Sequence, residues 1–195
     1  MTARIAVLAS GSGSNFQALI DAGAPIVVLV CNVPGAKCLQ RAAAAGIEAI
    51  VLDHKGFSSR AAYDLALVAE LSKRQISGVC LAGFMRLLTP AFLSAFPNAV
   101  LNVHPSLLPA FPGTHAARQA LERGVKITGC TVHFVDEGTD TGPIIAQAAV
   151  PVLTGDDEAA LQARIQLEEH RLFPAAVIAW AQGRLRVEGR TVKEP

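Results

Sequence analysis

Asn102 and His104 are two polar side chains that alternate along a short apolar segment ending at Pro105. Residues two apart on an extended strand point to the same face, so the amide and the imidazole would lie side by side. An amide N–H can hydrogen-bond a developing oxyanion, and an imidazole exchanges protons near neutral pH. The pair therefore suits an acyl-type transfer, although a lone histidine and an asparagine before a proline-rich loop also occur as purely structural residues.

An acidic, glycine-containing loop, Asp-Glu-Gly-Thr-Asp-Thr-Gly-Pro, occupies residues 136–143. A carboxylate from this loop could orient the imidazole ring and favour its protonated form. The spacing alone does not choose among Asp136, Glu137 and Asp140. A solvated acidic loop between two strands would have the same composition.

A glycine-serine loop follows the first apolar run and consists of Gly11, Ser12, Gly13, Ser14 and Asn15. Its backbone N–H groups and the start of the next helix favour an anion, so the loop suits a phosphate group. It does not fit a dinucleotide fingerprint, because Phe16 stands at the third glycine position and no acidic residue follows about 20 residues on. The alternative is a plain strand-to-helix turn.

Apolar runs that alternate with helical stretches must position these residues. The expected strands are 4–9, 25–31, 47–52, 76–82, 99–103, 128–135 and 144–150, and the expected helices are 15–22, 36–45, 58–74, 114–123 and a long one from about 156 to 183. We expect Leu65, Val68 and Leu71 to share one side of their helix, Pro174 to kink or interrupt the last helix, and 185–187 with 191–192 to pair as a hairpin. This pattern predicts an α/β fold with a mostly parallel sheet, helices on both faces and ligands at the carboxyl ends of the strands.

Composition narrows the class of protein. The chain has 195 residues, a net charge of +1, 51% hydrophobic and 17% charged residues, which favours one globular domain and no nucleic-acid surface. The four cysteines have no zinc-ligand spacing, so we expect no metal and structural thiols in a reducing compartment. Because no apolar run approaches a membrane span, we expect a cytoplasmic protein.

Four motifs occur together in a fixed order: G-S-G-S-N at 11–15, L-A-G-F-M-R-L-L at 81–88, N-V-H-P-S-L-L-P at 102–109 and D-T-G-P at 140–143. The ordered set resembles the folate-dependent phosphoribosylglycinamide formyltransferase family over residues from about 4 to 187. The resemblance implies a formyltransferase-type open twisted sheet with a Rossmann-like N-terminal half. It also implies one domain over 1–195, with a phosphate-binding half at about 1–100 and a folate and catalytic half at about 101–195.

The resemblance also implies a reaction in purine biosynthesis. A formyl group would pass from 10-formyltetrahydrofolate, the co-substrate, to the amine of glycinamide ribonucleotide. The transfer would be direct, through a tetrahedral intermediate, without a metal or an acyl-enzyme. The partners would be these small molecules, and the protein would be a monomer or a homodimer.

The family's functional residues map onto positions of this chain. Asn102, His104 and Asp140 match the catalytic set, so the resemblance selects Asp140 from the acidic loop. Residues 11–15 match the phosphate loop, and Glu169 matches a carboxylate near the ribose and amine. The matched folate-binding positions are Arg60, Met85, Arg86, Leu87, Leu88 and again Asn102, while Leu81, Phe92, Val100 and Val135 would either wall the pterin or belong to the core.

Three other functions remain open. Methionyl-tRNA formyltransferase shares the motif at 102–109 but carries a tRNA-binding domain, for which this chain has neither the length nor the basic charge. A formyltetrahydrofolate deformylase would pass the formyl group to water. A non-catalytic phosphoribosyl-binding module would keep the loop 11–15 without needing Asn102, His104 and Asp140.

One departure from the family is Ser12, where many members have asparagine. The backbone amide of Ser12 can do the same work as that of asparagine.

Overall fold

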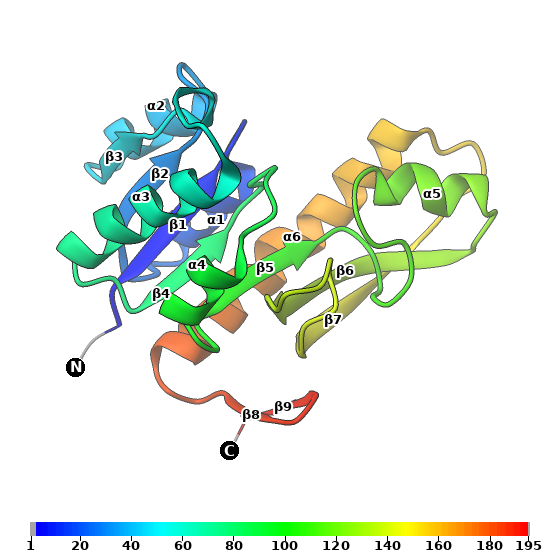
Figure 1. The fold of residues 1–195 in the computed structure, drawn as a ribbon. Helices are drawn as coiled ribbons and strands as arrows, with labels where there is room; N and C mark the ends of the chain where they lie inside the picture. The colour runs from blue at the N-terminus through cyan, green and yellow to red at the C-terminus, as the bar shows by residue number, and fades with distance from the viewer. Residues whose placement is uncertain (1–2, 195) are drawn as a thin grey trace.

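The protein is a nine-stranded open sheet with helices on both faces (Figure 1). The structure is a computed structural model, and it describes residues 3–194. The strand order is β3-β2-β1-β4-β5-β6-β7-β9-β8. The strands are β1 (Ile5–Ala9), β2 (Ile26–Cys31), β3 (Glu48–Val51), β4 (Gly78–Leu81), β5 (Val100–His104), β6 (Ile127–Phe134), β7 (Ile144–Pro151), β8 (Arg186–Glu188) and β9 (Thr191–Lys193). The predicted α/β fold and the predicted C-terminal hairpin are confirmed.

The sheet changes character at β5. The strands from β3 to β5 along the sheet pair in parallel, whereas β6 pairs antiparallel with β5 and β7 antiparallel with β6. The strand order reverses between β1 and β4, which is where an open α/β sheet forms a ligand crevice at its carboxyl edge. Antiparallel pairing adds direct cross-strand neighbours, and the pairs Asn102–His133 and His104–Thr131 face each other across β5 and β6.

Six α-helices cover the described part of the sheet: α1 (Ser14–Asp21), α2 (Lys37–Ala44), α3 (Arg60–Lys73), α4 (Pro90–Ala95), α5 (Ala116–Glu122) and α6 (Glu158–Ala181). Side chains alternate along β1, so that Ile5 and Val7 join the hydrophobic cluster with α1, α2 and α6, whereas Ala6 and Leu8 join the cluster with α3 and α4. Helix α5 packs with α6 in a third cluster beside β6 and β7. The carboxyl edge of the sheet therefore lies between two firmly packed helical layers.

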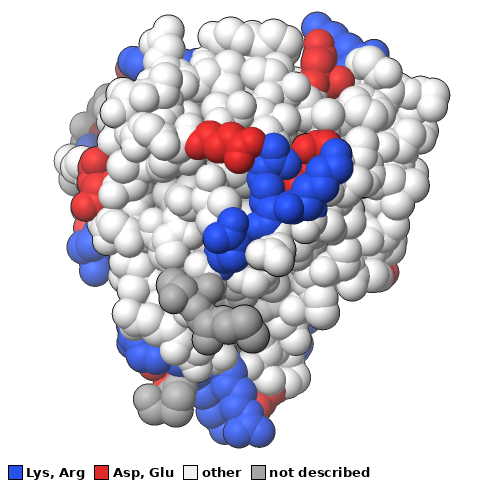
Figure 2. All heavy atoms as spheres, turned by 90° about the vertical axis from the view of Figure 1, so that its left-hand side faces the viewer, with Lys and Arg blue, Asp and Glu red and all other residues white. Residues whose placement is uncertain are grey.

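The surface around α2, β3 and α3 has charges of both signs close together. Figure 2 shows basic and acidic side chains side by side on this face, between wide uncharged areas. One group is an ion-pair network in which Arg74 contacts Glu48 at 2.5 Å and Glu70 at 2.9 Å, while Lys73 contacts Glu70 at 2.5 Å. None of the described helices combines the length and apolar character that a membrane crossing requires.

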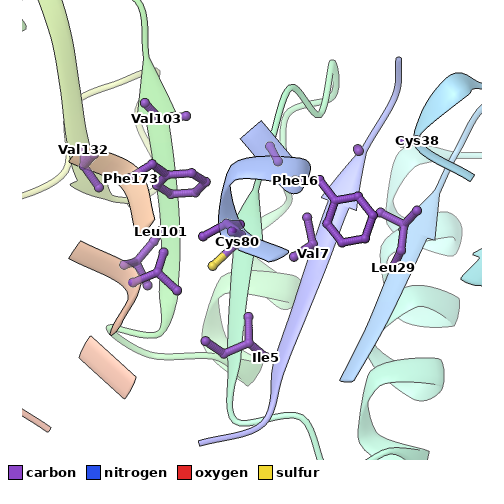
Figure 3. Packing of buried hydrophobic residues seen from close by; sticks show 14 of the residues in the cluster. Ile5, Val7, Phe16, Leu29, Cys38, Cys80, Leu101, Val103, Val132 and Phe173 are labelled. Atoms are coloured by element: carbon purple, nitrogen blue, oxygen red, sulfur yellow. The ribbon is translucent and has the colours of Figure 1, made fainter. Parts of the chain in front are cut away.

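Two aromatic rings anchor the helices that border the site. Figure 3 shows Phe16 of α1 lying over the sheet near Val7 and Leu29, and Phe173 of α6 lying near Val103 and Val132. Both rings are fully buried, and burying a phenylalanine side chain contributes about 2 kcal/mol. Because Phe16 stands one residue after the glycine-serine loop, its burial fixes the start of α1 at the end of β1.

Three local expectations differ from the structure. Helix α6 continues without a break through Pro174, because Phe173, Pro174 and Val177 are buried together and this packing offsets the missing N–H. In α3 the buried face carries Tyr63, Asp64, Leu67 and Leu71, while Leu65 is 61% exposed, so Leu65 does not share a buried side with Leu71. Helix α4 was not predicted; it is a short helix with Pro90 in its first turn and Phe92 in the core.

Candidate active site

The His104 side chain lies between two oxygen acceptors at the end of β5. Its Nε2 atom is 2.8 Å from the Phe111 carbonyl oxygen, and its Nδ1 atom is 3.4 Å from Asp140 Oδ2. The ring is only 4% exposed. A carbonyl and an ionised carboxylate only accept hydrogen bonds, so a ring that carries a proton on each nitrogen matches both neighbours. The ring is thus held from both sides, and Nε2 can turn to a reacting oxygen only by releasing the Phe111 carbonyl.

The Asp140 carboxylate is held in place by the loop across from it. Its Oδ2 atom accepts a hydrogen bond of 2.7 Å from the Gly113 backbone N–H, and its Oδ1 atom lies 3.8 Å from His133 Nε2. Asp140 has a left-handed backbone with φ of 55°, a conformation that aspartate and asparagine adopt more readily than most residues. The structure thus brings Asp140 to His104, whereas the Asp136 side chain bonds within its own loop to Gly138 and Thr141.

The Asn102 amide is oriented by His133, its cross-strand neighbour on β6. Asn102 Nδ2 is 3.2 Å from His133 Nε2, and His133 Nδ1 is 2.8 Å from the Phe134 carbonyl oxygen. Because the Nδ1 position must donate to that carbonyl, Nε2 of the neutral ring is free to accept from Asn102. Burial lowers the pKa of His133 below its ordinary value, which keeps the ring neutral. One Asn102 N–H is thereby fixed, and the other is left for a ligand.

The proline-rich segment after β5 is tied down by a buried hydroxyl. Thr131 Oγ1 donates to the Ser106 carbonyl at 2.7 Å, and it accepts from the Leu108 N–H at 3.0 Å. The Gln147 amide on β7 donates both to Thr131 Oγ1 and to the Leu108 carbonyl, each at 2.9 Å. These bonds fix the loop that carries Phe111, and hence the carbonyl that His104 contacts.

The glycine-serine loop uses its two glycines differently. Gly13 is buried, has φ of 69°, and a Cβ there would lie 2.7 Å from Cys38 Cβ on α2. Gly11 is exposed, and a Cβ there would meet nothing within 4 Å. Gly13 is therefore required for packing against α2, whereas the space beside Gly11 is open to a ligand.

A buried amide–carboxylate pair lies between the loop and α6. Asn15 Nδ2 donates to Glu169 Oε2 at 2.8 Å, and the two residues are 9% and 4% exposed. Burial raises the pKa of the Glu169 carboxyl above its ordinary value, and the bond from Asn15 partly opposes that shift. Asn15 Oδ1 is buried and has no partner among the described residues. The pair leaves polar atoms at the end of the loop for a further contact.

The segment 83–88 follows β4 at the carboxyl edge and exposes apolar side chains. Met85 is 73% and Leu87 57% exposed, while Leu88 is half-buried. Arg86 lies over the Tyr63 ring of α3, with its guanidinium carbon 4.7 Å from the ring centroid, and Arg60 is exposed at the start of the same helix. The segment thus offers an apolar, exposed strip next to the crevice.

The four apolar residues considered for a pterin wall belong to the core in this structure. Leu81, Phe92 and Val100 are buried in the cluster with α3 and α4, and Val135 packs half-buried against it.

Two hollows lie near the site. One of about 190 Å³ is bordered by residues that include Leu108, Pro112, Asp140 and Arg190, and one of about 470 Å³ by residues that include Ser14, Gln17, Arg41 and His170.

The cysteines and the possible metal ligands lie apart from this site in their properties. All four cysteines are free and buried, and burial raises the pKa of Cys38 and of Cys130 to about 12, so both stay protonated. Over residues 3–194, no three His, Cys, Asp or Glu side chains cluster closely enough to hold a metal.

Sequence reasoning missed three residues that shape the site. His133 was not among the candidate site residues, although it orients Asn102. Ser10 Oγ accepts from the Met85 N–H at 2.9 Å and donates to Asn32 Oδ1 at 2.7 Å, linking the ends of β1, β2 and β4. Arg41 Nε donates to the Ser12 carbonyl at 2.9 Å. The available signal was weak, since each contact depends on how distant strands and helices meet.

Comparison with known proteins agrees with this geometry. The sequence profile of the formyl transferase family matches residues 3–177. The chain is 48% identical over 193 residues to a phosphoribosylglycinamide formyltransferase of Mycobacterium tuberculosis, covering 97% of this chain and 90% of that one. It is 50% identical over 199 residues to a trifunctional purine biosynthetic protein adenosine-3 of Drosophila pseudoobscura pseudoobscura. That alignment covers 98% of this chain but only 15% of the length of the Drosophila protein.

Among solved structures, glycinamide ribonucleotide transformylase 1 from Symbiobacterium toebii superposes with a TM-score of 0.97 at 51% identity, covering 99% of this chain and 94% of that one. Nearly the whole described chain is matched by the family profile, by the two relatives and by the Symbiobacterium toebii structure. The resemblance that the ordered motifs indicated is therefore confirmed, and the chain belongs to the formyl transferase family.

Proposed function

We propose that the protein is a phosphoribosylglycinamide formyltransferase of purine biosynthesis. It moves a formyl group from 10-formyltetrahydrofolate to the amine of glycinamide ribonucleotide and leaves tetrahydrofolate. The observation that carries this proposal is the convergence of Asn102, His104 and Asp140 at the carboxyl edge that also holds the glycine-serine loop. The relatives named for this activity support it.

Asn102 and His104 would stabilise negative charge on the formyl oxygen. When an amine attacks the formyl carbon, the carbonyl oxygen becomes an oxyanion, and the free Asn102 N–H is a donor for it. His104 would be the second donor, once its Nε2 releases the Phe111 carbonyl. Asp140, 3.4 Å from His104 Nδ1, would hold that ring in place. The attacking amine must lose a proton and the folate nitrogen must gain one, and His104 with Asp140 is suited to relaying it.

Backbone donors would bind the phosphate of the ribonucleotide. Residues 11–15, of which Gly11 and Ser12 are exposed, lie at the start of α1, where the helix N-terminus favours an anion. Glu169, beside Asn15, would contact the ribose or the amine of the same substrate. In this proposal the part of the chain up to about residue 100 supplies the phosphate site, and the part from about 101 supplies Asn102, His104 and Asp140 within one domain, 1–195.

The folate would lie against the segment 83–88. Met85 to Leu88 would contact the pterin through backbone groups and apolar side chains, and Arg60 would reach the glutamate tail. The four free thiols suit the reducing cytoplasm, which we propose as the location of the reaction. A monomer or a homodimer without a resident metal is sufficient for this chemistry.

A transfer assay tests the proposal. Wild-type protein is mixed with 10-formyltetrahydrofolate, with or without glycinamide ribonucleotide, and the folate product is followed by absorbance. Product that forms only with the ribonucleotide supports the transferase. Product that forms equally fast without it indicates a deformylase, and no product in either mixture favours the phosphoribosyl-binding module.

A further inference from the structure

We propose that Arg41 of α2 is a positioning residue that turns the amides of the glycine-serine loop toward the substrate phosphate. This inference rests on the proposed function and deepens its phosphate site. Two consecutive carbonyls of the loop point at α2. The Gly11 carbonyl accepts from the Cys38 backbone N–H at 3.1 Å, and the Ser12 carbonyl accepts from Arg41 Nε at 2.9 Å.

Because peptides are planar, these two hydrogen bonds also fix the direction of the N–H groups that follow each carbonyl. In a trans peptide the carbonyl and the following N–H point in opposite directions. Since the carbonyls of Gly11 and Ser12 point toward α2, the N–H groups of Ser12 and Gly13 point away from it. Within residues 3–194 neither N–H has a hydrogen-bond acceptor. Both N–H groups are therefore directed to the side opposite α2 and are left for a ligand there.

Arg41 is the side chain on which this arrangement depends. The Cys38 contact is a backbone bond that any residue would keep, and Gly13 packs on Cys38 from the same direction. Ser12 is exposed, so its peptide has few other restraints. Arg41 is itself held by Gln17 of α1, whose Oε1 atom accepts from Arg41 Nη1 at 3.1 Å. Without Arg41, the Ser12–Gly13 peptide is free to turn its carbonyl toward the anion, which repels it.

The simplest competing explanation is that Arg41 acts through its charge alone. Two substitutions separate the explanations. Arg41→Gln removes the charge but keeps an N–H donor as many bonds from the backbone as Nε, whereas Arg41→Met removes both charge and donor at similar length. Lys37→Met on the exposed side of α2 is the control, because it removes a charge from the same helix without a contact to the loop.

The experiment measures Kd by calorimetry for glycinamide ribonucleotide and for its riboside, which lacks the phosphate. We expect Arg41→Met to weaken ribonucleotide binding roughly 10- to 100-fold, the value of one charge-assisted hydrogen bond, and to leave riboside binding unchanged. The ribonucleotide Kd of Arg41→Gln should stay within about threefold of the wild-type value, and that of Lys37→Met within about twofold. Equal losses for Arg41→Gln and Arg41→Met would overturn the positioning role in favour of charge.

A purely structural role is distinguished by the riboside. If Arg41→Met weakens ribonucleotide and riboside equally, the residue only supports the fold, and the proposal is wrong. Should Arg41→Met fail to fold, Gln17→Leu takes its place, because it keeps Arg41 but removes its restraint. It should weaken ribonucleotide binding by more than about threefold and spare the riboside; no selective loss refutes the inference. A wild-type protein that does not prefer the ribonucleotide refutes the phosphate site itself, independently of Arg41.

Discussion

The two ends of the crevice are built by different means. At the glycine-serine loop the donors are backbone amides, and the neighbouring helix α2 sets their direction through Cys38 and Arg41. At the end of β5 the working groups are the side chains Asn102 and His104, and residues from β6 and from two loops orient them. A backbone site tolerates changes of side chain but not of conformation, whereas a side-chain site depends on each individual group.

This difference predicts the largest effect at His104. The variant His104→Asn should lower kcat roughly 10³-fold, because it removes both a donor to the oxyanion and the proton relay. Ribonucleotide Kd should change less than about threefold, since the loop 11–15 is untouched. The matched control is His115→Asn, an exposed histidine that pairs with Glu158 and whose left-handed backbone asparagine tolerates. Wild-type kcat in both variants would remove His104 from the mechanism.

A smaller effect is expected at Asp140. Asp140→Asn preserves the side-chain shape, and asparagine also accepts the left-handed backbone at φ of 55°. We expect kcat to fall roughly 10²-fold, because the His104 ring loses the carboxylate that orients it, while the free energy of unfolding changes by less than about 1 kcal/mol. Single-turnover rates and urea unfolding measure the two quantities. A large loss of stability with an unchanged turnover rate would show that the carboxylate serves the fold alone.

The two glycines of the loop separate binding from folding. Gly13→Ala should destabilise the protein by about 2 kcal/mol or more, because it combines a left-handed backbone with a contact of 2.7 Å to Cys38 Cβ. Gly11→Val should leave stability within about 1 kcal/mol yet weaken ribonucleotide binding roughly tenfold, because its side chain fills the open space beside the phosphate site. Thermal unfolding and calorimetry compare them. Unchanged affinity in Gly11→Val would contradict the phosphate site.

The smallest effect concerns pH and Glu169. Burial raises the pKa of this carboxyl in the folded protein, so its stabilising contribution is complete below the pKa of the unfolded chain, about 4.3, and is lost as pH rises through the folded value. Glu169→Gln keeps an acceptor for Asn15 but cannot ionise. The variant should therefore gain stability relative to wild type between pH 4 and pH 8, as measured by urea unfolding. A constant difference over this range would contradict the buried-carboxylate interpretation.

The sequence alone predicted most of the strands and helices, but not α4. Continuous apolar runs such as 25–31 and 76–82 can be buried on both faces only within a covered parallel sheet, so they predicted β2 and β4 at their observed places. The glycine-serine loop could also be recognised from the sequence. Its neighbours in space, the end of β1 and the start of α1, are also its neighbours in the chain.

Tertiary structure decided everything that joins distant segments. Spacing could not choose among Asp136, Glu137 and Asp140, because the choice depends on a loop that meets Gly113 from another part of the chain. His133 reaches Asn102 only through the register of β6 against β5, and a shift of one residue would turn it to the other face. Arg41 reaches Ser12 only because Phe16 and Cys38 pack their helices onto the same side of the sheet. Local periodicity carries no record of such contacts, since they arise from burying several elements together.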